Sequence, residues 1–564
     1  MVFGPGTPFN PWRFDERTSI LKTLIDPNGS SFDSICQAFN WQIPESFNIA
    51  AAVCDRHRDV SDRPALFCET ASGRTGQYTF ADLYRLSNKL ANVFLAMGVS
   101  PGDRIAILLP QRVETGLCHL AAWKIGAISL PLSVLFGTDA LRYRLEDSGA
   151  KVVIGATEGL EKIQSLRDEL PELDTIIDCD DEKGGFWSLL DRAVESFETA
   201  STLADDPAIV IYTSGTTGPP KGAVLAHRCL LGNLTGFEMS QNLFPREDDL
   251  MWTPADWAWT GGLLDGLIPA WFYRCPVLGY DGGRFDPEKA CDLMTRHRVR
   301  NAFIPPTALK MLRQVEDIHE RGVRLRSVMS AGESLGAQIY EWAEEVLGIQ
   351  VNEMWGQTEF NYIVGNCSTI MPVKPGSMGK SYPGHRVEPV DDKGNVLADG
   401  VIGELCALRD DPVMFLGYWK RDQATRDKFI GPWWSTGDVG YRDSDGYLWF
   451  VGRKDDVISS AGHRIGPGEI EDCMLKHSAV VQAAAVGTPD ELRGEIVKAF
   501  IVLASGEAPS DELAQSIQDM VRGDLAAYEY PREIEFVSEL PMTTTGKVRR
   551  IELREREIAR KRKS

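Results

Sequence analysis

Short apolar runs alternate with longer amphipathic stretches over residues 64–156. The apolar runs have the length of buried strands, and the stretches between them repeat hydrophobic residues at helical spacing. The apolar runs are ALFC at 65–68 and DRIAILLP at 103–110. The helical stretches are residues 78–99 and the first part of residues 114–132, which ends in a further apolar run. Strands that alternate with helices indicate βαβ units, so we expect a mostly parallel sheet.

The same pattern returns in the middle of the chain. Residues 207–211 resemble a buried strand that runs into a loop rich in glycine and hydroxyl groups. Residues 324–333 and 348–359 each run from a short strand into a turn that contains glycine. Ligands of α/β folds bind at the carboxyl ends of such strands, so we expect binding residues in these three turns.

The last third of the chain changes character. Residues 376–450 hold many short β-like runs between DDKGN, ADG and DSDG turns, which predicts a small β-barrel or an antiparallel sheet. The polar GRKDD segment at 452–456 is typical of a hinge, and the segments after it suggest a compact α+β domain. We therefore expect an α/β protein with two domains. Residues 1–453 would form a large N-terminal domain of parallel-sheet α/β subdomains plus a small β-barrel, and residues 454–564 a small mobile α+β C-terminal domain.

Composition narrows the class of protein. At 564 residues the chain exceeds the roughly 250–300 residues at which one hydrophobic core stops growing. The 81 acidic side chains outnumber the 60 basic ones and give a net charge of −21, which disfavours nucleic acid and anionic membranes as partners. No stretch reaches the ~20 apolar residues of a membrane span, and the N-terminus lacks the pattern of a secretion signal. The eleven cysteines occur singly, so we expect reduced thiols and a cytoplasmic protein without stable membrane insertion.

The strongest local signal for chemistry is the loop YTSGTTGPPKG, which starts at residue 212. Its backbone N–H groups and hydroxyls can surround phosphate oxygens, and its lysine adds a mobile positive charge. The spacing is not that of a Walker loop. A plain surface turn would not need this combination of glycines, hydroxyls and a lysine behind a buried strand. The candidate phosphate ligands are Thr213, Ser214, Gly215, Thr216, Thr217, Gly218 and Lys221.

Six further motifs follow this loop along the chain. They are Ala331-Gly332-Glu333-Ser334, Trp355-Gly356-Gln357-Thr358-Glu359, Ser435-Thr436-Gly437-Asp438, Gly452-Arg453-Lys454-Asp455-Asp456, Ala461-Gly462-His463-Arg464-Ile465 and Pro541-Met542-Thr543-Thr544-Thr545-Gly546-Lys547. In these residues the chain resembles the adenylate-forming superfamily, and within it the short- and medium-chain acyl-CoA synthetases related to acetyl-CoA synthetase. The resemblance spans roughly residues 65–555. It implies an enzyme that joins a carboxylic acid to AMP, releases pyrophosphate, and passes the acyl group to coenzyme A.

The first half-reaction of such an enzyme needs positive charge around the carboxylate, the α-phosphate and the departing pyrophosphate. By resemblance, Thr213 to Lys221 would hold the β- and γ-phosphates of ATP. Thr358 and Glu359 would contact the α-phosphate and Mg²⁺, with Glu359 as the metal ligand. Further nucleotide contacts would be Gly332, Glu333 and Ser334 at the adenine, Gln357, Asp438 at both ribose hydroxyls, Arg453, and Arg464 beside the AMP phosphate.

The C-terminal motifs imply a second set of roles. In the resembling enzymes a lysine in the position of Lys547 bridges the substrate carboxylate and the ATP phosphate during adenylation. The C-terminal domain then rotates about the position of Asp455, withdraws the lysine and brings the Ala461-Gly462 loop to the pantetheine arm of coenzyme A. These assignments remain implications of the resemblance at this point.

The segment Asp256-Trp257-Ala258-Trp259-Thr260-Gly261-Gly262 resembles the aromatic segment near the acid pocket of acetyl- and medium-chain acyl-CoA synthetases. We expect Trp257 to be a core residue and Trp259 to line the acyl pocket. Acetyl-CoA synthetases carry a tryptophan that caps the pocket where this chain has Gly356. The glycine therefore predicts room for an acid larger than acetate, whether medium-chain, branched or aromatic.

Three alternatives share the same motifs. An adenylating ligase could load an acyl carrier protein instead of coenzyme A, although only seventeen residues follow Lys547 (564 − 547) and hold no carrier segment. A luciferase-like oxygenase has the same motifs but a different acid-pocket segment. An inactive nucleotide-binding scaffold would normally lose Lys547 or Glu359, and both are present. The expected ligands are thus a small carboxylic acid, ATP with Mg²⁺, and coenzyme A; the sequence leaves the oligomeric state open.

Overall fold

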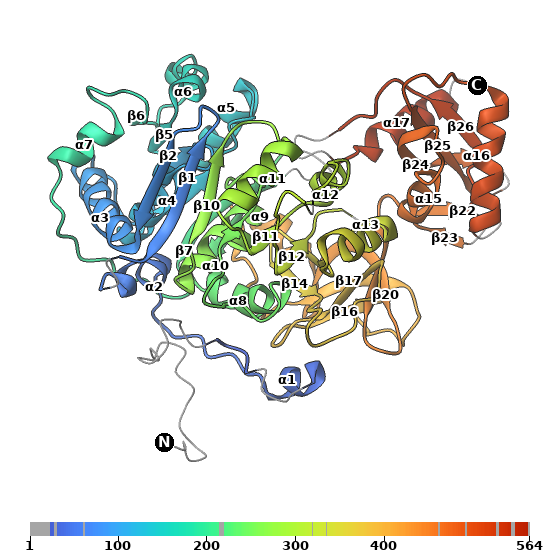
Figure 1. Cartoon of the computed structure of the whole chain (residues 1–564), viewed down its shortest axis with the longest axis horizontal. Coiled ribbons are helices and arrows are strands. Elements are labelled where there is room, and N and C mark those ends of the chain that lie inside the picture. The colour runs from blue at the N-terminus through green and yellow to red at the C-terminus, as the bar shows by residue number, and fades with distance from the viewer. Residues whose placement is uncertain are drawn as a thin grey trace. The chain divides into compact units, whose positions relative to one another are not determined.

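The computed structural model of the chain describes residues 23–26, 31–59, 62–213, 219–318, 320–333, 335–460, 463–490, 493–525, 529–542 and 547–561. They belong to two compact units (Figure 1). Unit 1 comprises residues 1–375, 379–386 and 409–427. Unit 2 comprises residues 376–378, 387–408 and 428–564. The expected domain boundary between residues 453 and 454 stays a prediction.

The first sheet of unit 1 is mostly parallel. Its strand order is β15-β14-β13-β12-β11-β9-β10-β1-β2. The run from β13 to β1 is parallel, whereas β14, β15 and β2 are antiparallel to their neighbours. The strands are β1 (Pro64–Thr70), β2 (Thr75–Thr79), β9 (Met251–Trp252), β10 (Val277–Asp281), β11 (Asn301–Phe303), β12 (Ser327–Ser330), β13 (Asn352–Gln357), β14 (Asn361–Gly365) and β15 (Ser377–Ser381).

The second sheet of unit 1 has the order β18-β8-β7-β4-β3-β5-β6. The five strands from β7 to β6 are parallel, and β8 and β18 are antiparallel additions at one edge. These strands are β3 (Arg104–Leu108), β4 (Ile128–Pro131), β5 (Val152–Gly155), β6 (Thr175–Asp178), β7 (Pro207–Thr213), β8 (Lys221–Ala226) and β18 (Gly417–Tyr418). The predicted parallel α/β architecture is therefore confirmed.

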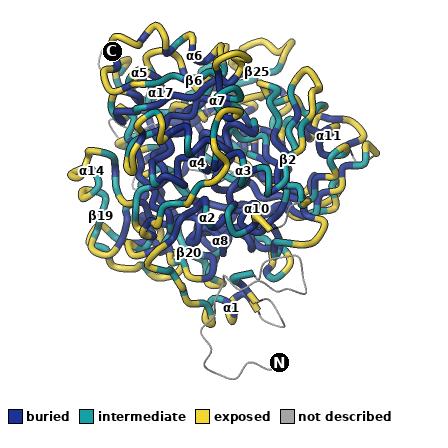
Figure 2. Tube along the Cα trace, turned by 90° about the vertical axis from the view of Figure 1, so that its left-hand side faces the viewer, coloured by how far each residue is buried: buried dark blue, intermediate teal, exposed yellow. Residues whose placement is uncertain are grey.

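Two helices of unit 1 are mainly apolar and are buried along their whole length. They are α4 (Val113–Lys124) and α8 (Cys229–Ser240), and Figure 2 shows both in the dark blue interior. Helices of this composition belong in the core of a large protein rather than on its surface. By contrast, α3 (Phe80–Ala96) is amphipathic and starts with a capping box between Thr79 and Asp82.

The remaining helices of unit 1 are short. They are α1 (Phe32–Ala38), α2 (Ile49–Val53), α5 (Thr138–Ser148), α6 (Thr157–Gln164), α7 (Phe186–Arg192), α9 (Thr260–Gly262), α10 (Ile268–Phe272), α11 (Pro287–Arg296), α12 (Pro306–Leu312), α13 (Ala337–Trp342) and α14 (Asp422–Arg426). Between α9 and α10 the chain forms one π-helical turn, η3 (Leu263–Leu267). Such turns often occur at functional sites.

Unit 2 begins with antiparallel strands in the order β16-β17-β20-β21. They are β16 (Val387–Val390), β17 (Gly403–Leu408), β20 (Trp433–Arg442) and β21 (Leu448–Arg453), with β19 (Phe429–Ile430) beside β20. We expected a small barrel or an antiparallel sheet in this region. The strands described there form an open antiparallel run in which β16 and β21 do not pair, so no closed barrel is present among them.

The C-terminal part of unit 2 has the expected α+β composition. Its sheet has the order β23-β22-β25-β24, with β26 parallel to β25. The elements are β22 (Ile458–Ser460), β23 (His463–Ile465), α15 (Pro467–Met474), β24 (Val480–Asp490), β25 (Gly494–Leu503), α16 (Asp511–Asp524), β26 (Glu533–Phe536) and α17 (Arg550–Lys561). Its core joins side chains of the sheet to those of α15 and α16, among them Ile470, Val497 and Ile517.

Two general expectations can be compared with the structure. All eleven cysteines are unpaired thiols, and nine of them are buried. None of the described helices combines the length and the apolar character that crossing a membrane requires.

Candidate active site

The predicted phosphate loop connects two antiparallel strands of unit 1. Thr213 ends β7 and lies opposite Lys221, the first residue of β8. The apolar side chains of β7 are buried, which fixes the position from which the loop leaves the sheet. Thr213 and Lys221 therefore frame the loop, whereas Ser214, Gly215, Thr216, Thr217 and Gly218 lie outside the described residues.

Tyr418 connects the phosphate loop to the predicted catalytic carboxylate. It lies on β18, which pairs with β8 so that Tyr418 is opposite Ala223. The Lys221 ammonium nitrogen lies 5.3 Å from the centre of the Tyr418 ring. The Tyr418 hydroxyl donates a hydrogen bond of 2.5 Å to Oε1 of Glu359. Two groups far apart in sequence, Lys221 and Glu359, are thus brought together by one tyrosine.

Tyr418 was missed by the sequence analysis. Its signal is weak, because it lies between predicted motifs, near the end of the short apolar run at residues 413–419. Two backbone hydrogen bonds hold it in place: Leu416 N–H donates to Val224 (2.8 Å), and Trp419 N–H donates to Gly222 (2.7 Å). An aromatic pair, Tyr418-Trp419, in such a segment is the feature that could have drawn attention to it.

Thr358 and Glu359 lie in the turn between β13 and β14. Asn361 closes this turn with φ +51°, a left-handed conformation that asparagine tolerates. Glu359 is 9% exposed, and its backbone carbonyl accepts a hydrogen bond from Phe415 N–H (2.7 Å). Its Oε2 has no hydrogen bond within the part of the chain that the structure describes. One carboxylate oxygen thus remains for another ligand.

The predicted adenine-binding residues occupy the neighbouring strand end. Because β12 and β13 are parallel, the turns that follow them leave the same edge of the sheet. Gly332 has φ +102°, which favours glycine, and both Glu333 carboxylate oxygens lie within hydrogen-bond distance of the Thr307 hydroxyl (3.0 and 3.1 Å). Ser334 lies outside the described residues, and Gln357 ends β13.

The environment of Gly356 changes one part of the acyl-pocket prediction. A Cβ atom at this position would lie 1.6 Å from the backbone oxygen of Asn361 on β14. No side chain can therefore be added at Gly356 unless the β13–β14 hairpin shifts. A tryptophan placed there would not refill a pocket but would disrupt the hairpin. The inference that Gly356 lines the acyl pocket stays a prediction.

The two tryptophans of the acid-pocket segment have different surroundings. Trp257 is fully buried, as expected of a core residue. Trp259 is half-buried, precedes α9, and packs edge-on against Phe136 with 5.8 Å between ring centres. Burial raises the pKa of Asp256 at the start of this segment, although a hydrogen bond from Ala258 N–H opposes the shift.

Unit 2 brings together Asp438, predicted to bind the ribose hydroxyls, and Arg453, another predicted nucleotide contact. Asp438 on β20 lies opposite Arg453 on β21. The Arg453 guanidinium donates to Asp438 Oδ1 at 2.5 Å, and Asp438 is only 4% exposed. The charge of Arg453 therefore balances a buried carboxylate that would otherwise be costly.

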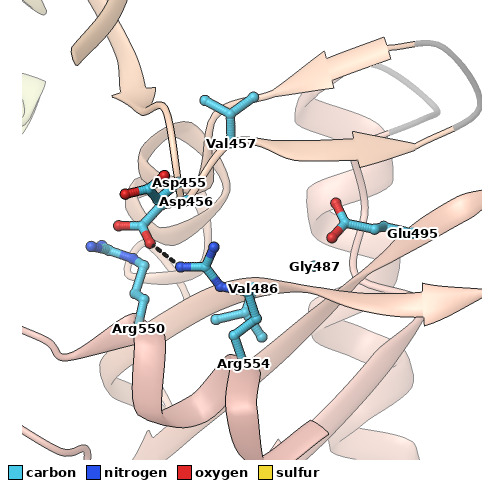
Figure 3. A pocket seen from close by; sticks show the side chains of 8 residues that line it. All are labelled: Asp455, Asp456, Val457, Val486, Gly487, Glu495, Arg550 and Arg554. Atoms are coloured by element: carbon cyan, nitrogen blue, oxygen red, sulfur yellow. Dashed lines mark hydrogen bonds and ion pairs between the residues drawn. The ribbon is translucent and has the colours of Figure 1, made fainter. Parts of the chain in front are cut away.

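The predicted hinge residue lies between two anchored neighbours, all within unit 2. Lys454 forms ion pairs with Glu404 (3.0 Å) and Asp392 (3.4 Å). Asp456 accepts a hydrogen bond from Arg554 of α17 at 2.6 Å, and Asp455 between them is exposed (Figure 3). The two anchors leave Asp455 as the residue least constrained by side-chain contacts in this turn.

The same helix, α17, is fixed a second time near the predicted hinge residue. Arg550 of α17 binds both carboxylate oxygens of Glu471, at 2.9 and 2.5 Å. Burial raises the pKa of Glu471, and the charge of Arg550 opposes that shift. Arg550 and Arg554 line a small pocket together with Asp455 and Asp456 (Figure 3). Since Lys547 lies three residues before Arg550, the first residue of α17, these contacts restrict where the chain around Lys547 can lie.

The other predicted residues of unit 2 are only partly described. Lys547 is exposed, and the neighbouring Val548 forms a β-bridge with Met542. The backbone of Arg464 belongs to β23, which is antiparallel to β22. Ala461 and Gly462 lie outside the described residues, as does the side chain of Arg464.

The residues present fit a magnesium ion that arrives with a nucleotide. Among the described residues no group of three or more His, Cys, Asp or Glu side chains could hold a metal ion alone. Mg²⁺ is usually bound by one or two carboxylates together with substrate phosphates and water, and Oε2 of Glu359, which has no hydrogen bond among the described residues, could supply one such ligand.

Comparisons with known proteins agree with this geometry. Residues 55–419 match the AMP-binding enzyme family, and residues 469–547 match the AMP-binding enzyme C-terminal domain. The chain is 35% identical to the mitochondrial acyl-coenzyme A synthetase ACSM4 of Homo sapiens over 537 residues, covering 92% of each chain. It is also 35% identical to an acetyl-coenzyme A synthetase of Bacillus subtilis over 550 residues, 93% of this chain and 95% of the relative.

A solved structure gives the same result for the fold. An anthranilate CoA ligase in complex with anthranoyl-AMP superposes with a TM-score of 0.83 at 30% sequence identity. The match covers 91% of this chain and 98% of that one.

Tyr418→Phe tests the link between Lys221 and Glu359. The change removes one hydrogen bond to a charged group, which is worth about 1.5–3 kcal/mol. We expect ATP-dependent pyrophosphate release with an accepted acid to fall about tenfold to a hundredfold, while the protein stays folded and its melting temperature falls by no more than a few degrees. Tyr441→Phe, which alters a tyrosine stacked on Trp449, is the matched control. Parent-like pyrophosphate release in folded Tyr418→Phe would contradict this role.

Arg554→Gln tests the anchor of the hinge. Without the ion pair to Asp456, the turn at residues 454–457 should open more often, and its amide hydrogens should exchange about tenfold faster. Arg556→Gln, on the same helix but paired with Glu535, should leave that exchange unchanged. Hydrogen exchange of a peptide covering the turn is the measurement. Equal exchange in the two variants would show that Arg554 does not anchor the hinge.

Proposed function

Because this chain belongs to the AMP-binding enzyme family of AMP-forming acyl-CoA synthetases, which use ATP, Mg²⁺ and coenzyme A, we propose that its substrate is a carboxylic acid larger than acetate. The observation that carries the proposal is Gly356. No side chain from this position can cap the pocket, because the backbone of Asn361 leaves no room for one. A medium-chain, branched or aromatic acid is the substrate class this favours.

The proposed reaction has two steps. Oxygen of the acid carboxylate attacks the α-phosphate of ATP, pyrophosphate leaves, and an acyl-adenylate forms. The thiol of coenzyme A then attacks the acyl carbon, AMP leaves, and the thioester is released. Each step transfers one group and needs no oxidant or reductant.

The residues of unit 1 would act in the first step. Lys221 and the loop after Thr213 bind the β- and γ-phosphates, and Thr358 contacts the α-phosphate. Glu359 holds Mg²⁺, which neutralises phosphate charge when it is bound. Tyr418 orients Glu359 through the hydrogen bond described above.

The residues of unit 2 would act in both steps. Asp438 binds the ribose hydroxyls, with Arg453 beside it, and Arg464 contacts the AMP phosphate. Lys547 contacts the carboxylate and the phosphate during adenylation only, and Asp455 is the hinge about which the C-terminal domain turns. Ala461 and Gly462 present the pantetheine arm. A cytoplasmic location is part of this proposal, since all eleven cysteines are unpaired thiols.

An acid screen tests the substrate class. Each buried methylene contributes about 0.8 kcal/mol, so four extra methylenes favour hexanoate over acetate by roughly 3 kcal/mol, or about a hundredfold in kcat/KM. Acids of two to twelve carbons, branched acids and benzoate are compared by pyrophosphate release with and without coenzyme A. Acetate as the best substrate would refute the size proposal. Acyl-AMP formation without thioester formation would instead favour the carrier-protein ligase.

Lys547→Ala separates the two steps. We expect adenylation from acid and ATP to be nearly abolished, because the attacking carboxylate loses its cation. Thioester formation from a supplied acyl-adenylate should stay largely intact. Lys476→Ala, an exposed lysine of the same unit, is the control and should leave both steps unchanged. Equal losses in the two half-reactions of Lys547→Ala would remove this lysine from its assigned role.

A further inference from the structure

A buried carboxylate, one oxygen of which has no hydrogen bond within the described residues, lies directly after the acid-pocket segment. Asp265 is part of the π-helical turn η3 and is 5% exposed. Its Oδ1 is buried and makes no hydrogen bond to any residue that the structure describes. Burial raises the pKa of Asp265 well above its ordinary value, and the Asn361 side chain opposes this shift. A carboxyl group in such surroundings is costly unless a partner binds it.

A second polar group without a partner lies next to it. Asn361 is 6% exposed, and its amide nitrogen Nδ2 also lacks a hydrogen bond within the described part of the chain. The residue after it is also close to Asp265, since the charge of Asp265 helps to raise the pKa of Tyr362. Apart from their closeness to each other, these two buried polar atoms have no hydrogen-bond partner among the described residues, which is rare in folded proteins.

Both groups lie on elements already connected with the acid. The π-helical turn begins with Leu263, whose N–H donates to the carbonyl of Trp259. On the other side, Asn361 pairs with Gln357, and Tyr362 pairs with Gly356, across the β13–β14 hairpin. Asp265 and Asn361 thus meet between the two segments from which the sequence predicted the acyl pocket.

We propose that Asp265 and Asn361 bind a hydroxyl or amino substituent of the carboxylic acid, so that the substrate carries a polar group on its chain or ring. A carboxyl group can donate and accept a hydrogen bond, and the amide N–H₂ donates. Together they match a hydroxyl or amino group, which also donates and accepts. This inference rests on the proposed function and specifies the substrate class of the same site.

The test compares acids that differ only in the polar group. Hexanoate is paired with hydroxyhexanoates, and benzoate with hydroxybenzoates and aminobenzoates, using kcat/KM for pyrophosphate release. In the parent, at least one polar acid should exceed its plain partner by about tenfold or more, because a site built for a hydrogen bond rejects an analogue that lacks it. Asp265→Leu should reduce that ratio to about one or below, and Asp265→Asn should give an intermediate ratio.

The control is Asp248→Asn, which changes an exposed carboxylate paired with Arg300 and should keep the parent's ratio. A parent that favours every plain acid over its polar partners would overturn the inference. So would a ratio that is unchanged in both Asp265 variants, since the carboxyl group would then hold only buried water. If Asp265→Leu does not fold, the parent's preference and Asp265→Asn decide the question. Failure of the proposed function looks different, because then no acid would support pyrophosphate release in the parent.

Discussion

The hydrogen bond from Tyr418 to Glu359 is the interaction on which the geometry of unit 1 depends. Lys221, Glu359 and Tyr418 come from three segments: the β7–β8 hairpin, the β13–β14 turn and β18. More than a hundred residues separate the hairpin from the other two segments, and the β13–β14 turn belongs to a different sheet from β18. Loop closure over such distances is entropically costly, and the apolar burial of the two sheets offsets it. Within this frame the Tyr418 hydroxyl donates a hydrogen bond to Glu359, and the Tyr418 ring lies beside the ammonium group of Lys221.

The strongly negative net charge makes this local arrangement necessary. A polyphosphate is repelled by the protein as a whole and must find positive charge and backbone N–H groups at one place. Lys221 supplies charge, while a tyrosine hydroxyl rather than a second cation holds Glu359. In the proposed role, Oε2 of Glu359, which has no hydrogen bond among the described residues, would be the oxygen that binds magnesium.

Much of the fold and the order of the site motifs could be predicted from the sequence. Strand–helix alternation indicated the parallel sheets, since apolar periodicity directly reports which faces are buried. Tyr418 could not be predicted, because its role arises from the pairing of β18 with β8, two strands remote in sequence. The buried pair of Lys498 with Glu557 was also unpredictable, since Glu557 lies in a charged C-terminal stretch that resembles a solvated helix. Asp265 was missed for the same reason: its lack of partners is a property of three-dimensional packing.

The contact between Gly356 and the backbone of Asn361 has a consequence for changing the substrate range of this enzyme. Substrate pockets are usually reshaped by exchanging side chains on one wall, but at Gly356 the hairpin presents main chain alone, so a pocket wall proposed there would offer no side chain to exchange. For the acyl pocket proposed above, redesign would therefore act through Trp259 and the residues of the π-helical turn. A lineage that inherits this hairpin would keep position 356 as glycine, because any side chain there requires the β13–β14 backbone to move.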